Sequence, residues 1–155
     1  MVSALSFAEG RIAVLDAQGA IMRTEFALNK FKELNESAEI VEMRAKLERV
    51  QSELKKIAEE AEKDGLTWDD AKKAEMAKRQ ETQLAERKHL AERFQAEQVA
   101  VQQTIMRELG EKPNTALKEL IKLEGIGLVL SPQAVIHADT SFDITAKLTE
   151  RLNKM

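Results

Sequence analysis

Few residues in this chain have the types and spacing that catalysis or metal binding requires. The 155-residue sequence has no cysteine, and neither of its two histidines, His89 and His137, has a second histidine four residues away, as a helical zinc site would. Adjacent carboxylates occur at positions 59–60 and 69–70, but no apolar run that would wall off a pocket lies beside them. The sequence also contains no glycine-rich phosphate loop and no Ser-centred nucleophile elbow. We therefore expect no enzyme, no bound cofactor and no metal site.

The side chains better suited to binding are apolar. Trp68 stands in the first turn of a predicted helix, where its indole either closes the end of a hairpin or offers a surface to a partner. Methionines carry flexible thioethers that adapt to different shapes. For the residues of the first long helix, packing inside the hairpin is the alternative role. The candidate partner-binding residues are Met43, Leu47, Val50, Leu54, Trp68 and Met76.

A pair of long helices, predicted within residues 36–109, must position these side chains. Apolar residues of the first helix recur at alternating three- and four-residue steps, which indicates a coiled-coil seam. An apolar stripe upstream has another phase, so the buried face is predicted to rotate between Ala38 and Met43. The second helix repeats the period more weakly. The predicted seam comprises Ile40, Met43, Leu47, Val50, Leu54, Ile57 and Ala61 on the first helix, and Ala77, Gln80, Leu84, Arg87, Ala91, Phe94, Gln98, Val101 and Ile105 on the second.

The two helices are predicted to reverse direction at residues 64–67. We expect Gly65 to end the first helix in the left-handed conformation, and Thr67 with Asp70 to form a capping box for the second. A turn this short makes the helices antiparallel. A helix of some forty residues is roughly 60 Å long, which is more than the width of a compact domain of this mass, so the hairpin is predicted to project.

The flanking segments, 11–35 and 110–155, are predicted to form a small body that contains strands. Residues 11–16 are typical of an edge or inter-subunit strand, and residues 127–130 and 134–138 are predicted to form a β-hairpin around Pro132. Helices are predicted from about Ala20 into the hairpin, over 114–123, and after a cap within 140–143. The strands are too few and too short to bury both faces within one chain, so we expect copies to associate. The candidate assembly residues are Ile12, Val14, Leu128, Leu130, Val135 and Ile136.

The composition and charge of the chain bear on which classes of partner it binds. The formal net charge is −3 and charges of both signs alternate along the helices, so electrostatics gives no reason to expect nucleic acid. No run approaches the roughly 18 apolar residues of a membrane-spanning helix. Residues 1–10 are small and apolar at first, with Ser6 and Ala8 at the −3 and −1 positions of a signal-peptidase site. We interpret them either as the remnant of a signal peptide or as an N-terminus without that role.

The order of the elements resembles the Skp/OmpH family of periplasmic chaperones. The matching stretches are residues 12–16 (IAVLD), 31–34 (FKEL), 127–132 (GLVLSP) with 134–135 (AV), and 143–145 (DIT) followed by Leu148. The resemblance implies a homotrimer, with a mainly α-helical fold in which a long antiparallel coiled-coil hairpin projects from a trimerising body that contains the strands. It implies an ATP-independent holdase in the periplasm that keeps unfolded outer-membrane proteins in a cavity between the hairpins, and it favours the signal-peptide interpretation.

The chain departs from this family in two respects. Its pI near 5.6 contrasts with a strongly basic relative, so contact with lipopolysaccharide or an acidic membrane is not carried over. Residues 110–113 contain Gly110 and Pro113 where relatives run a continuous helix. A different class of function also fits a long hairpin, namely a structural coiled-coil adaptor that bridges two folded partners. A holdase suppresses aggregation of denatured porins without nucleotide, whereas an adaptor does not.

Overall fold

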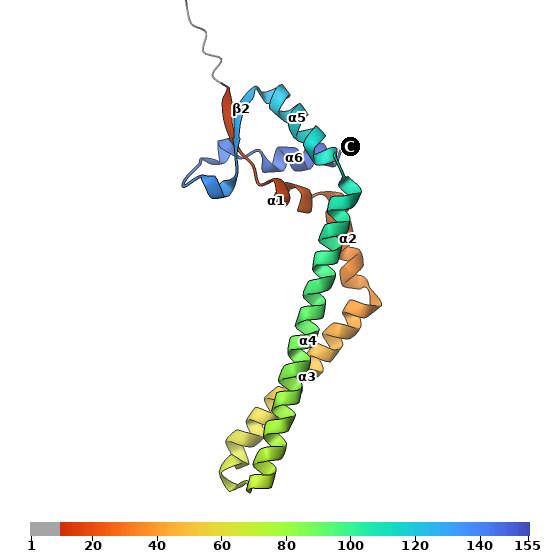
Figure 1. Cartoon of the computed structure of the whole chain (residues 1–155), viewed down its shortest axis with the longest axis vertical. Coiled ribbons are helices and arrows are strands. Elements are labelled where there is room, and N and C mark those ends of the chain that lie inside the picture. Colours follow the sequence, from red (N-terminus) through yellow and green to blue (C-terminus); the bar gives the residue numbers. More distant parts are fainter. Residues whose placement is uncertain (1–9) are drawn as a thin grey trace, which may run out of the picture. The chain divides into compact units, whose positions relative to one another are not determined.

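The computed structural model describes residues 10–155 (Figure 1). Residues 1–9, which belong to the segment interpreted as a signal-peptide remnant, lie outside the described residues. The described chain is mainly helical with one small sheet, as the sequence predicts. Its elements are β1 (Arg11–Val14), α1 (Ala17–Met22), α2 (Glu25–Glu36), α3 (Ala38–Asp64), the 3₁₀ turn η1 (Gly65–Thr67), α4 (Asp70–Leu109), α5 (Lys112–Glu124), β2 (Ile126–Leu130), the 3₁₀ turns η2 (Pro132–Ala134) and η3 (Thr140–Phe142), and α6 (Thr145–Leu152).

The chain divides into two compact units. Residues 10–30 together with 102–155 form one, which we call the terminal unit, and residues 31–101 form the other, the hairpin unit. The helices α2 and α4 contribute residues to both. Each unit is described by itself below.

The sheet of the terminal unit joins segments from the two ends of the chain. Strand β1 pairs with β2 in parallel, with Ile12 opposite Leu128 and Val14 opposite Leu130. Helix α5 packs against β2, and α6 packs against α1 and α5, so that these elements bury a core in which Ile144 and other apolar residues are almost inaccessible to solvent. The buried apolar residues of this unit are Ala13, Leu15, Ala20, Ile21, Ala27, Ile105, Leu109, Ala116, Leu120, Ile126, Ile144, Leu148 and Leu152.

The predicted β-hairpin after residue 127 is wrong. Residues 134–138 are not a strand, and β2 pairs with β1 instead. Pro132 fixes its own φ and lacks an amide donor, and it opens a 3₁₀ turn in which the Ala134 amide donates to the Ser131 carbonyl. Ile136 is fully exposed, so no buried apolar face holds this segment as a strand within the chain.

Hydrogen bonds tie the two ends of the chain together beyond the sheet. The hydroxyl of the buried Thr145 accepts from the backbone amide of Asp16, at 3.1 Å. The hydroxyl of Thr149 donates to the Ala20 carbonyl, at 2.9 Å, and the Ile144 amide donates to the Val14 carbonyl. The terminal unit is therefore built from residues more than a hundred positions apart, which a local reading of the sequence does not reveal.

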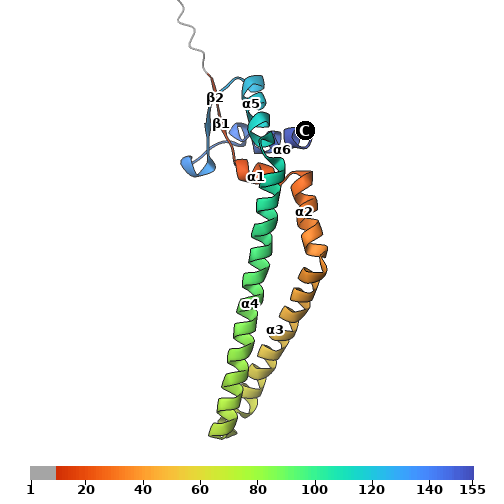
Figure 2. The same ribbon diagram turned by 45° about the vertical axis from the view of Figure 1, so that its right-hand side comes forward.

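In the hairpin unit, α3 and α4 run side by side in opposite directions, as Figures 1 and 2 show. The helix predicted to be continuous from Ala20 is interrupted twice. The buried Thr24 hydroxyl donates to the Ile21 carbonyl and accepts from the Ala27 amide, which ends α1 and starts α2. Ser37 caps α3 by accepting from the Ile40 amide, at 3.3 Å. The second break falls next to the predicted rotation of the buried face.

The reversal at residues 64–67 is at the predicted place, but its mechanism is different. Gly65 has φ of −58°, so it is right-handed rather than left-handed, and the chain tightens into the 3₁₀ turn η1. The predicted capping box is also wrong, because Thr67 donates to the Asp64 carbonyl while the carboxylate of Asp69 accepts from the Lys72 amide at 2.7 Å. Asp69 is the residue closer to the start of α4, and its short side chain reaches the free amides there.

The predicted seam of α4 is wrong by one position over its first half. Ala77, Gln80, Leu84, Arg87 and Ala91 are all exposed, whereas Met76 and Leu90 are buried. Positions 83 and 97, each seven residues from Leu90, are half-buried. Burying methionine and leucine removes more apolar area from water than burying alanine at the adjacent positions, and this decides between two overlapping registers.

Candidate functional site

An apolar cavity of about 190 Å³ lies between the two helices of the hairpin and is partly open to solvent. Its walls come from α3 and α4 beside a cluster of buried residues in which Ile40, Met43 and Val50 of α3 pack with Leu90 of α4. Leu47 and Phe94 pack against that cluster and are half-buried. The six residues that line the cavity are Met43, Arg44, Leu47, Leu90, Ala91 and Phe94.

A second apolar feature of the hairpin unit is a shallow groove along α4. It follows the face that the sequence predicted to be the seam, and Leu84 at its centre is 39% exposed. Glu81 and Lys88 contribute one charge of each sign. The groove is open to solvent, because α3 packs against the neighbouring face of α4 and does not cover this one. Its lining residues are Ala77, Gln80, Glu81, Leu84, Ala85 and Lys88.

The candidate partner-binding residues divide into two groups in the single chain. Met43, Val50 and Met76 are buried within the hairpin unit. Leu47, Leu54 and Trp68 are half-buried, with Trp68 at the end of η1 in an extended conformation. Of the six, the cavity brings together Met43 and Leu47.

Ion pairs supplement the thin apolar seam at two levels. Arg79 of α4 binds the carboxylate of Glu53 on α3 and lies 3.9 Å from that of Glu60, and the hydrogen bond with Glu53 raises the pKa of Arg79. Arg93 of α4 binds Glu39 of α3. These ion pairs thus join α3 and α4 beside the apolar seam.

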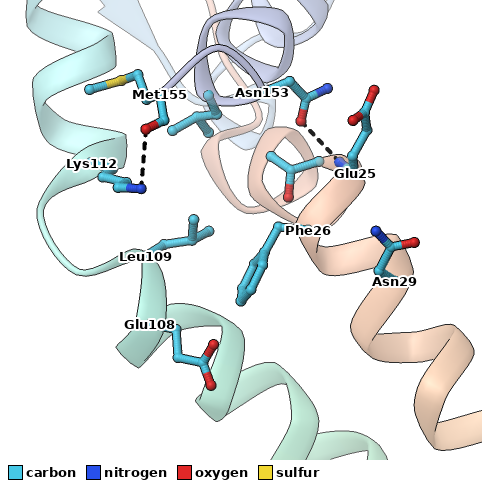
Figure 3. Close-up of a pocket in the computed structure, with 10 residues that line it drawn as sticks. Glu25, Phe26, Asn29, Glu108, Leu109, Lys112, Asn153 and Met155 are labelled. Carbon is cyan, nitrogen blue, oxygen red and sulfur yellow. Dashed lines mark hydrogen bonds between the residues drawn. The ribbon is translucent and has the colours of Figure 1, made fainter.

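A pocket in the terminal unit has a mixed lining (Figure 3). Its volume is about 360 Å³, and Phe26 and Leu109 extend into it from α2 and α4. Two of its polar side chains make hydrogen bonds across it: the Asn153 side chain accepts from the Glu25 amide at 2.9 Å, and the Lys112 ammonium donates to the Met155 carbonyl oxygen at 3.3 Å. These contacts join α2, α5 and the chain end, which is a structural role.

Four of the candidate assembly residues meet on one face of the sheet. The register places Ile12 beside Leu128 and Val14 beside Leu130. In the single chain Ile12 is 45% and Leu128 49% exposed, and the other two are half-buried. Val135 is half-buried and Ile136 fully exposed in the segment after η2. The terminal unit thus presents an apolar sheet face that the rest of the described chain leaves uncovered.

Within residues 10–155, no three or more histidine, aspartate or glutamate side chains gather in a way that would hold a metal ion. His89 and His137 are both exposed. None of the described helices combines the length and apolar character needed to cross a membrane.

Sequence reasoning missed the residues that complete the hairpin cavity. Leu90 lies next to a predicted seam position rather than on it, and Arg44 and the Glu53–Arg79 pair are among the interspersed charges of the helices, whose spacing does not distinguish them. The seven-residue spacing from Met76 through Gln83 to Leu90 is the signal that identifies the second register.

The described chain combines a coiled-coil hairpin with a small sheet built from segments near its two ends, as expected for the Skp/OmpH family. The family model described as "Outer membrane protein (OmpH-like)" matches residues 11–152, and the chain belongs to this family, which confirms the resemblance found in the sequence. The Skp/OmpH proteins are a family of periplasmic chaperones for outer-membrane proteins.

A curated relative extends this match over the whole chain. The "Skp-like protein" of Pseudomonas aeruginosa is 24% identical over 157 aligned positions, which cover 100% of this chain and 91% of the relative. No solved structure matches the chain significantly.

Proposed function

We propose that this protein is an ATP-independent periplasmic holdase that binds unfolded outer-membrane β-barrel proteins and prevents their aggregation before membrane insertion. Membership of the OmpH-like family supports the class of function. The observation that carries the proposal is the hairpin unit, in which α4 leaves the groove around Leu84 open and the cavity beside Phe94 unfilled. Both are apolar surfaces of the kind that an unfolded chain contacts.

The composition of these surfaces fits weak and adaptable binding. The groove on α4 combines small alanines with a single leucine and has charges at Glu81 and Lys88. Each such contact is worth little, and a disordered client loses conformational entropy when it is confined. Retention then depends on many modest contacts at once. A client is released when a more favourable state competes, such as folding into a barrel in the membrane.

We propose in addition that the working form is a homotrimer joined through the terminal units. A two-stranded sheet is marginal on its own, and the face formed by Ile12, Val14, Leu128 and Leu130 is apolar and uncovered in the single chain. Packing of three such faces would bury this surface. The hairpins of three copies would then enclose the space in which a client is held.

The test is dilution of a urea-denatured outer-membrane porin into buffer with this protein, without nucleotide, followed by light scattering. We expect scattering to fall as the protein is added and to reach a minimum near one assembly per porin. An unrelated helical protein at the same mass concentration is the control. Scattering equal to that control would contradict the holdase function and favour the adaptor.

A further inference from the structure

We propose that the cavity between α3 and α4 is a subsite for one aromatic side chain of a bound unfolded chain. This inference rests on the proposed holdase function and adds a discrete site to an otherwise distributed surface. The cavity is lined by Met43, Arg44, Leu47, Leu90, Ala91 and Phe94.

The size and the lining of the cavity suit a single ring. Its volume of about 190 Å³ is comparable to that of an apolar protein cavity of about 150 Å³ that binds benzene. Five of its six lining residues are apolar, so water inside would find few hydrogen-bond partners. Filling this space with a side chain from outside restores contacts that the two helices do not make with each other.

The lining favours an aromatic occupant over an aliphatic one. The ring of Phe94 can pack edge-to-face or offset against a second ring. The thioether of Met43 makes favourable contacts with aromatic ring edges. The guanidinium of Arg44 can lie over a ring face. An aliphatic side chain would gain only the burial that all apolar groups share.

The cavity is reached from solvent on the side of Arg44 and Ala91, both of which are exposed. The Arg44 guanidinium donates to the side-chain oxygen of Asn35 at 2.7 Å, so this hydrogen bond holds the cation beside the opening. On the inner side, Met43 and Leu90 are at most 5% exposed and form the floor. A ring can therefore enter without separation of the buried cluster.

The first test uses the methionine methyl groups of the full chain as reporters. The protein, labelled with carbon-13 at its methionine methyls, is titrated with two short Gly/Ser-rich peptides that differ only in one central residue, phenylalanine or leucine. We expect the phenylalanine peptide to move the Met43 methyl signal by its ring current and to bind about two- to tenfold more tightly than the leucine peptide. The signal of Met106, an exposed methionine of the terminal unit, should stay in place.

A matched pair of variants tests the location. Ala91→Phe places a ring in the opening of the cavity, and Ala96→Phe makes the same change five residues later at an exposed position, roughly 140° around the helix. We expect Ala91→Phe to abolish the preference for the phenylalanine peptide and Ala96→Phe to keep it. The experiment on the unsubstituted chain decides the proposal even where Ala91→Phe fails to fold.

Two results would overturn the subsite. One is a Met43 signal that stays in place up to the solubility limit of the phenylalanine peptide, and the other is equal binding of the two peptides. Porin aggregation measured on the same preparation separates this failure from that of the holdase function. Suppressed aggregation with a silent Met43 methyl rejects the cavity alone, whereas unsuppressed aggregation rejects the holdase function itself.

Discussion

Two leucines on α4 should differ sharply in what they contribute to stability. Leu90 is 4% exposed and packs with Ile40, Met43 and Val50, whereas Leu84 is 39% exposed in the open groove. We expect Leu90→Ala to lower the free energy of unfolding several times more than Leu84→Ala. The comparison is matched, because the substitution and the helix are the same and the sites are six residues apart.

The magnitudes follow from burial. Shortening Leu90 to alanine removes buried apolar groups at about 0.8 kcal/mol per methylene and enlarges a cavity, so the cost is about 3 kcal/mol. At Leu84 much of the side chain is already in water and no enclosed space is created, so the cost is about 1 kcal/mol or less.

The assay is urea unfolding followed by circular dichroism, with all variants at one protein concentration, because association changes apparent stability. Hydrogen exchange of α4 amides adds a local readout, since the hairpin unit can open separately from the rest of the chain. Equal costs at the two leucines would refute the assigned seam, and a larger cost at Leu84 would restore the register that the sequence predicted.

Three further changes probe the terminal unit. Leu130→Asp should reduce the assembly to single chains in light scattering, because it places an unpaired charge in the proposed interface, and an unchanged mass would reject that interface. Gly127→Ala should cost about 1–3 kcal/mol of unfolding free energy, because its Cβ would lie 2.7 Å from the Gly10 Cα. Gly65→Ala is the control and should change little, because Gly65 has a right-handed φ and its Cβ would meet only the Ala61 Cβ, at 4.0 Å. The hydrogen bonds at the start of α6 lower the pKa of Asp143, so its stabilising effect is present above its unfolded pKa and is lost as pH falls through the lower folded value. Asp143→Asn should weaken this acid dependence in the exchange rate of the first α6 amides, and an identical pH profile would contradict it.

The sequence predicts the architecture well where signals are local and strong. The heptads of α3 and the place of the turn at residues 64–67 both follow from spacing and residue type. It fails where the outcome depends on a contact far along the chain. The pairing of β1 with β2 crosses more than a hundred residues, and no local pattern distinguishes it from the hairpin expected around Pro132.

The predicted register of α4 is wrong for another reason. Two apolar stripes run along this helix one position apart, and only the packing against α3 selects Met76 and Leu90. The cavity cannot be predicted from the sequence for the same reason, since it depends on which side chains of two helices face each other. Two of the candidate residues, Met43 and Leu47, line this cavity because they lie at seam positions of α3.

The central claim is that the hairpin holds the client while the terminal units hold the assembly. Replacing residues 41–96 with a short Gly-Ser turn removes most of α3 and α4, including the groove around Leu84 and the cavity beside Phe94, and leaves the whole terminal unit in place. Size-exclusion chromatography with light scattering, run with and without urea-denatured porin, measures both properties on one sample. We predict a shortened protein that keeps the trimer mass and elutes without porin, whereas the unshortened chain elutes with it. A shortened trimer that still carries porin at the level of the full chain would contradict the account.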